Sequence, residues 1–107
     1  DGSPRPLSIA YAVLSSMLSN LLYADTYDIN ESLVITMFSN DKKDLLVVST
    51  KLWKKDALLT HSMRTSDLYK SYKLFNIMGN EIDFNLDNST LEFDVGREPV
   101  YLVAYKK

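Results

Sequence analysis

Two acidic residues, Asp83 and Asp94, have a spacing that could bring a pair of carboxylates together. If residues 88–89 form the tip of a hairpin, Asp83 falls opposite Asp94, and Asn85 falls opposite Glu92. Opposed side chains lie roughly 4.5–5.5 Å apart at Cβ, close to the carboxyl separation of about 5–5.5 Å in a retaining glycosidase. Catalytic carboxylates also need a cleft and unequal environments, whereas these two lie on the polar side of an alternating segment. We therefore interpret them as part of a solvated face and predict no catalytic residue.

His61 is the only histidine, and the chain contains no cysteine. A zinc site would therefore need carboxylates around this single imidazole, which shares its expected strand face with Leu59 and Met63. The three glycines are isolated in the sequence, so there is no glycine-rich loop of the kind that holds a phosphate. We interpret His61 as an ordinary strand residue and predict no metal site and no cofactor.

Three aromatic residues, Trp53, Tyr69 and Tyr72, lie in polar segments between or beside expected strands. Exposed aromatic rings can stack on sugar rings, so these residues are the candidates for binding a glycan. The alternative is that they cap the core, because large aromatic side chains are mostly buried in folded domains. Both interpretations stay open at the level of sequence.

The overall composition limits the classes of partner. The chain has 107 residues, with 12 Lys and Arg against 14 Asp and Glu, a net charge of −2. A chain of this length forms one domain with one core, and its charge gives no electrostatic reason to expect nucleic acid or an anionic membrane as partner. Because the sequence starts with Asp1, and residues 1–6 resemble a linker, we expect a piece of a longer protein.

Residues 7–22 have the three- and four-residue periodicity of an amphipathic helix, with Asn20 as an end signal. The apolar arc covers roughly 220°, wider than a helix packed on one side requires, and no charged residue occurs between Leu7 and Ala24. We therefore expect part of this helix to face another domain or a second copy of the chain. The run is too short and too rich in serine for a membrane span. The residues expected on this face are Ile9, Val13, Leu14, Met17, Leu18 and Leu21.

From residue 23 onward the period changes to two, which indicates strands over residues 23–107. The clearest hairpin joins residues 33–39 to 44–50 through Asn40-Asp41-Lys42-Lys43. A strand over 100–105 is apolar on both faces and should be central or covered. Short strands separated by turns predict one mostly β domain, an antiparallel β-sandwich with one N-terminal α-helix packed against it. The other expected strands cover residues 57–63, 72–78, 82–86 and 91–95.

The order of these features resembles the last barrel helix and C-terminal β-sandwich of retaining (β/α)₈-barrel glycoside hydrolases of the α-L-iduronidase, β-xylosidase and α-L-arabinofuranosidase kind. The resemblance rests on residues 1–14, 45–50, 72–82 and 98–102, the last containing Pro99-Val100-Tyr101. Ser49 stands where the family often has tryptophan, and Asn76 where it often has aspartate. The catalytic glutamates of the family lie on barrel strands, which this chain does not contain.

The resemblance implies a non-catalytic accessory domain that stabilises or orients a catalytic barrel, its partner in the parent chain. Two other hypotheses remain open. The domain could be a carbohydrate-binding module that uses exposed aromatic residues, or a protein-interaction domain that self-associates through its helix.

Overall fold

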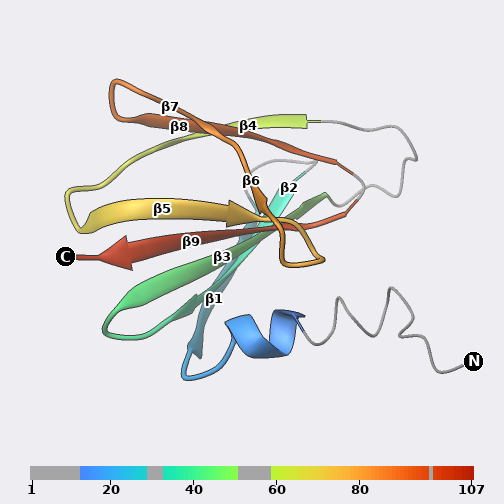
Figure 1. Cartoon of the computed structure of the whole chain (residues 1–107), viewed down its shortest axis with the longest axis vertical. Helices are drawn as coiled ribbons and strands as arrows, with labels where there is room; N and C mark the ends of the chain where they lie inside the picture. Colours follow the sequence, from blue (N-terminus) through green and yellow to red (C-terminus); the bar gives the residue numbers. More distant parts are fainter. Residues whose placement is uncertain (1–12, 29–32, 51–58, 97) are drawn as a thin grey trace, which may run out of the picture.

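The structure is a computed structural model that describes residues 13–28, 33–50, 59–96 and 98–107 (Figure 1). Strands account for 64% of the described residues and helix for 6%. The described strands are β1 (Leu22–Asp28), β2 (Leu33–Ser39), β3 (Lys43–Thr50), β4 (Leu59–Arg64), β5 (Tyr69–Phe75), β6 (Glu81–Ile82), β7 (Asn85–Asp87), β8 (Thr90–Val95) and β9 (Val100–Lys106). They form a six-stranded antiparallel sheet in the order β1-β2-β3-β9-β5-β6 and a three-stranded one in the order β4-β8-β7. The predicted fold class is therefore confirmed.

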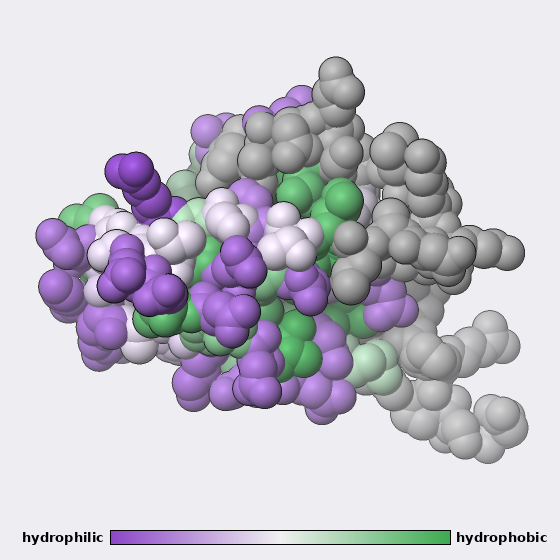
Figure 2. Space-filling view, turned by 90° about the horizontal axis from the view of Figure 1, so that it is seen from above, coloured by the Kyte–Doolittle hydropathy of each residue, from purple (hydrophilic) through white to green (hydrophobic). Residues whose placement is uncertain are grey.

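The two sheets pack face to face over the main core. In β8, the alternation of Leu91, Phe93 and Val95 with polar residues turns the apolar side chains toward the larger sheet, where they meet buried residues such as Val48 and Leu102. On the outer face of the small sheet, which Figure 2 views from above, hydrophilic residues predominate. This one-sided pattern is the arrangement that an alternating antiparallel strand produces.

Strand β9 lies in the middle of the larger sheet, between β3 and β5. Val100 and Leu102 belong to the core between the sheets, whereas Tyr101 and Val103 belong to a second cluster on the opposite face. The expectation of a central strand, apolar on both faces, is thereby confirmed.

The N-terminal helix covers this opposite face of the six-stranded sheet (Figure 1). Its described residues are 13–17, followed by a turn in which Asn20 has a positive φ of 64°, as expected for a helix-ending asparagine. The chain has entered β1 at Leu22, so the expected helix end at residue 22 is about one turn too late. An apolar leucine run fits a helix and a strand equally, and the left-handed Asn20 decides between them. No helix in the described part of the chain has the length and apolar character needed to cross a bilayer.

The β2–β3 hairpin is confirmed, but two other strand expectations are corrected. Strand β5 covers Tyr69–Phe75 rather than 72–78, because Asn76 ends it. Its side-chain oxygen accepts hydrogen bonds from the backbone N–H groups of Met78 (2.9 Å) and Asn80 (3.0 Å). A carboxylate oxygen would accept the same bonds, so asparagine can replace the aspartate that is frequent at this position in the resembling family.

The expected strand over 82–86 is two separate strands. β6 ends at Ile82 in the larger sheet and β7 begins at Asn85 in the smaller one, so the chain crosses between the layers over residues 83–84 (Figure 1). Leu86 is consequently 57% exposed instead of buried. Alternation alone could not reveal the crossing, because the same pattern continues through it.

Candidate functional site

Two of the three aromatic residues singled out in the sequence, Tyr69 and Tyr72, lie in one groove. Their ring centroids are 5.7 Å apart, with the ring planes inclined at 59°. The groove has a volume of about 480 Å³ and lies between the β4–β5 connection and the β7–β8 hairpin. We call it the aromatic groove; its lining includes Ser66, Tyr69, Tyr72, Phe84, Leu86 and Ser89. Trp53 lies outside the described residues, so its relation to the groove is not defined.

Both tyrosine hydroxyls are used within the domain. Tyr69 Oη donates a hydrogen bond to the Asp44 carboxylate, and Tyr72 Oη accepts one from the backbone N–H of Ser66 at 3.2 Å. Tyr72 also packs against the core between the sheets. These contacts fix the orientation of both rings, so the groove has a preformed aromatic wall.

Sequence reasoning missed two exposed apolar residues. Leu86 lines the groove and is 57% exposed, whereas Leu68, in the β4–β5 connection, is 71% exposed and is not one of the lining residues. Leu86 was assigned to the core because of its alternation, whereas no pattern in the sequence marked Leu68. Leu86 therefore adds apolar surface to the groove beside its aromatic lining, as is common in ligand sites.

A polar cluster around Asp44 lies at one end of the core between the sheets. The Asp44 side chain accepts hydrogen bonds from Ser39 and Tyr69, and Lys106 Nζ lies 3.3 Å from Asp44 Oδ1. Burial raises the pKa of the Asp44 carboxyl, but the hydrogen bonds from Ser39, Tyr69 and Lys106 and the charge of Lys106 bring it below its ordinary value. The cluster joins four strands, which makes it a structural anchor for one wall of the groove.

The carboxylates considered first do not form an opposed pair. Asn85 pairs with Glu92 as expected, but β7 begins there, and Asp83 lies in the crossing between the layers. Asp94 accepts a hydrogen bond from Thr60 Oγ1 at 2.8 Å on the exposed face of the small sheet. Both aspartates are exposed and line a small depression of about 120 Å³, so they are surface residues.

His61 is buried in β4, where it packs edge-to-face on Phe93 with ring centroids 5.6 Å apart. Burial lowers the pKa of His61 below its ordinary value of 6.5, so the imidazole is neutral at pH 7. Among the described residues, no three His, Asp or Glu side chains come together as metal ligands would.

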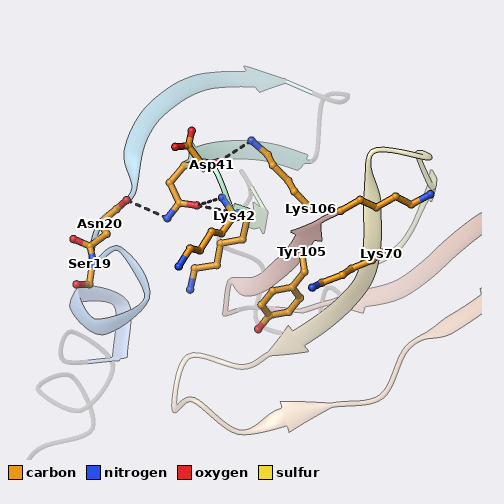
Figure 3. A pocket seen from close by; sticks show the side chains of 10 residues that line it. Ser19, Asn20, Asp41, Lys42, Lys70, Tyr105 and Lys106 are labelled. Carbon is orange, nitrogen blue, oxygen red and sulfur yellow. Dashed lines mark hydrogen bonds between the residues drawn. The ribbon is translucent and has the colours of Figure 1, made fainter.

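A second concave site, which we call the lysine hollow, lies beside the end of the helix (Figure 3). Its volume is about 480 Å³. Lys42 reaches it from the β2–β3 turn and Lys70 from β5, with the Tyr105 ring between these two, whereas the Lys106 side chain extends from β9 toward Asn40 (Figure 3). The remaining lining residues are Ser19, Asn20, Asn40, Asp41, Lys43 and Lys107.

No expectation from the sequence included the lysine hollow. Its lysines come from three separate stretches that meet only because β3, β9 and β5 are neighbours in the sheet. Lys43 pairs with Tyr105 across β3 and β9, and Tyr105 pairs with Ser71 across β9 and β5. The adjacent pairs Lys42-Lys43 and Lys106-Lys107 were the only signal in the sequence that could have pointed to it.

The fold defines the class of the domain as an antiparallel β-sandwich with a helix on its outer face, and solved structures with a similar fold include three glycoside hydrolases. A family 39 glycoside hydrolase from Bacteroides cellulosilyticus WH2 matches 95% of the chain with a TM-score of 0.69 and 23% identity. A family 30 endoxylanase from Clostridium papyrosolvens C71 matches 92% with a TM-score of 0.64 and 10% identity. A family 30 subfamily 8 xylanase from Clostridium acetobutylicum matches 92% with a TM-score of 0.57 and 9% identity.

These matches confirm the predicted resemblance to glycoside hydrolases at the level of the fold. The chain spans only 20% of the length of the family 39 protein and 28% of each family 30 protein. No protein-family profile matches the sequence, and no curated protein matches it significantly.

Proposed function

We propose that this chain is a non-catalytic accessory domain of a glycoside-hydrolase-like protein, and that it stabilises or orients a catalytic barrel. The observation that supports the proposal is the share of each chain that the structural matches cover. Nearly the whole chain superposes on glycoside hydrolases, yet it accounts for little more than a quarter of their length at most. The surface positions of Asp83 and Asp94 give further support, because the depression that both line among the described residues is small, about 120 Å³, and both side chains are exposed, whereas catalytic carboxylates need a cleft and unequal environments.

The test uses a parent protein in which this chain accompanies a barrel domain. It compares that protein with a version from which residues 1–107 have been deleted. We expect the deletion to lower the melting temperature of the barrel, because the barrel loses an interdomain contact. A barrel whose melting temperature and activity are unchanged by the deletion would contradict the proposal.

A second test concerns the chain alone, which should not hydrolyse aryl-glycosides. Turnover that survives rigorous purification and is lost in Asp83→Asn or Asp94→Asn would reverse our assignment of these residues. A Thr60→Val variant, which removes the hydroxyl bonded to Asp94, provides a matched control on the same face.

The aromatic groove favours carbohydrate binding as a second candidate function. Its tyrosine rings, Phe84 and exposed Leu86 offer the apolar surface on which a sugar ring can stack. Calorimetry with xylan, arabinan and cellulose oligomers tests this. If the groove binds, Tyr69→Ala should abolish binding and Tyr69→Phe, which keeps the ring, should retain it. Equal loss in both variants would indicate that the hydrogen bond to Asp44 matters rather than stacking. Trp53→Ala tests the third aromatic residue.

A further inference from the structure

The lysine hollow concentrates positive charge in a chain that is acidic overall. Five lysines and one aspartate line it, a formal charge of +4, whereas the whole chain carries −2. All other residues together therefore carry a formal charge of −6. A concave site lined by one sign of charge focuses its field and attracts ligands of the opposite sign.

The walls of the hollow are held in place by hydrogen bonds centred on Asn40. Its side-chain oxygen accepts bonds from the backbone N–H groups of Lys42 (2.8 Å) and Lys43 (2.9 Å), and its side-chain nitrogen donates to the Asn20 carbonyl oxygen at 3.2 Å. Lys106 Nζ donates to the Asn40 carbonyl oxygen at 2.8 Å. The turn, the end of the helix and β9 are thus joined, and a ligand would meet a preformed site.

Of the five lysines that line the hollow, one makes contacts that hold the fold together, and the other four are available to a ligand. Lys106 is committed to Asp44, Ser39 and the Asn40 carbonyl oxygen. Within the part of the chain that the structure describes, the ammonium groups of the other four make no ion pair or hydrogen bond. These four residues are Lys42, Lys43, Lys70 and Lys107. Asp41 is the one carboxylate among the lining residues, so the lysine charges outnumber it and repel one another, and a bound anion would relieve that repulsion.

The distribution of charge favours a compact anion over an extended one. Nucleic acid is bound by basic residues spread along its backbone, and its affinity grows with the number of phosphates contacted. Here five of the twelve basic residues of the chain line one hollow, and the remaining residues together carry a net negative charge that would repel a long polyanion leaving it. A volume of about 480 Å³ is within the usual range of small-ligand sites, about 300–1,000 Å³.

We propose that the lysine hollow binds the carboxylate of an acidic sugar, a uronate unit of a glycan. The lysines provide charge for the carboxylate, the hydroxyl and amide groups of Ser19 and Asn20 can bond to sugar hydroxyls, and the Tyr105 ring offers a surface for the sugar ring. The choice of a sugar as carrier of the anion rests on the proposed function, whereas the anion site itself rests only on the geometry of this chain.

The test is an NMR titration of backbone amide shifts in the full chain with trigalacturonate, with xylotriose as the neutral control and sodium sulfate as the inorganic one. We expect trigalacturonate to shift the amides of residues 40–43, 70 and 105–107, and xylotriose of equal length to leave them unchanged. Binding should weaken as ionic strength rises, because salt screens exposed charges.

Single substitutions then test which residues of the hollow contact trigalacturonate. Lys42→Ala and Lys70→Ala should each weaken trigalacturonate binding by roughly two- to fivefold, as expected for one exposed ion pair. Asp41→Asn should strengthen it, because it removes the one carboxylate in the lining. Lys73→Ala is the matched control, since it removes an exposed lysine of the same strand, β5, that does not line the hollow.

Three results would overturn the proposal. The first is the absence of shifts with trigalacturonate, and the second is a loss in Lys73→Ala equal to that in Lys42→Ala. The third is sulfate binding as tightly as trigalacturonate, which would show a site for an inorganic anion only. The accessory role is tested by deleting residues 1–107 from the parent protein, so either proposal can fail without the other.

Discussion

At the scale of single residues, the side chain of Asp44 is a buried carboxylate whose contacts connect four strands. It is 5% exposed and receives hydrogen bonds from β2, β5 and β9 while itself belonging to β3. A buried carboxylate is stable only when such donors replace the water it has lost. Asp44 therefore connects the groove wall at Tyr69 with the hollow wall at Lys106.

The first prediction concerns the pH dependence of stability. Because the pKa of Asp44 is lower in the folded state than its ordinary value of 3.8, the ionised form stabilises the fold above that value. This contribution is lost as the pH falls through the folded-state pKa. Asp44→Asn should lower the free energy of unfolding by about 1.5–3 kcal/mol at neutral pH, the range for hydrogen bonds to charged groups.

Denaturant unfolding at several pH values checks this. The wild type should lose stability between about pH 5 and pH 2 more steeply than Asp44→Asn does. Asp94→Asn, which removes an exposed carboxylate, should change stability by no more than about 0.5 kcal/mol. Parallel pH profiles for the wild type and Asp44→Asn would contradict our account of the cluster.

A second prediction at this scale concerns Gly79, which has a positive φ of 84° in the turn after β5. A Cβ placed there would lie 3.2 Å from Val13 Cγ2 on the helix. Gly79→Ala should therefore destabilise the domain by about 1–2 kcal/mol from backbone strain alone, with steric pressure added. Thermal unfolding measures the effect. The same substitution in a Val13→Ala background should cost less, because the neighbouring side chain is smaller; equal costs would exclude a contact between turn and helix.

At the scale of elements, the small sheet is held mainly through β8. Phe93 is 3% exposed in the core, whereas Phe84, in the crossing between the sheets, is only partly buried. Phe93→Ala should therefore cost about 3–5 kcal/mol and Phe84→Ala less. Asp83→Asn should change stability by no more than about 0.5 kcal/mol. Chemical denaturation gives all three values, and a large loss in Asp83→Asn would reveal a partner for that carboxylate.

The strands also show which features of the fold could be predicted from the sequence. Hydrophobic alternation found the β2–β3 hairpin, the central β9 and the pairing of Asn85 with Glu92, because each depends on local pattern and turn chemistry. It could not find the crossing after Ile82, where the pattern continues while the chain changes sheets. The lysine hollow was hidden for a related reason, since neighbours across a sheet are set by topology and not by spacing in the sequence.

At the scale of the whole molecule, the N-terminal helix forms a third layer on the outer face of the six-stranded sheet. Val13, Leu14, Met17, Leu18 and Leu21 pack against the second cluster on the sheet, but none of them is fully buried; Ile9 lies outside the described residues. Their half-buried state leaves apolar surface beside exposed Leu22 and Tyr23. The expectation of an interdomain or self-association face here stays a prediction.

Sedimentation at high concentration tests that prediction on the isolated chain. We expect concentration-dependent association through the helix side, because contiguous apolar patches promote it. Ser16→Glu, which adds a charge to the exposed helix face, should reduce association. Ser62→Lys, which adds a charge opposite Glu92 on the outer face of the small sheet, should have no effect on association. A monomer at every concentration would remove the physical argument for a covering domain.

The central place of β9 has a consequence for synthesis on the ribosome. β9 follows the other described strands in the chain, yet it separates β3 from β5 in the sheet. Until it has left the exit tunnel, the nascent chain holds two unfinished half-sheets, each with an open edge that could pair with a neighbouring polypeptide. The larger sheet can therefore be completed only after nearly all residues of this domain have been synthesised, and β9 is the segment that converts two aggregation-prone edges into the interior of one sheet.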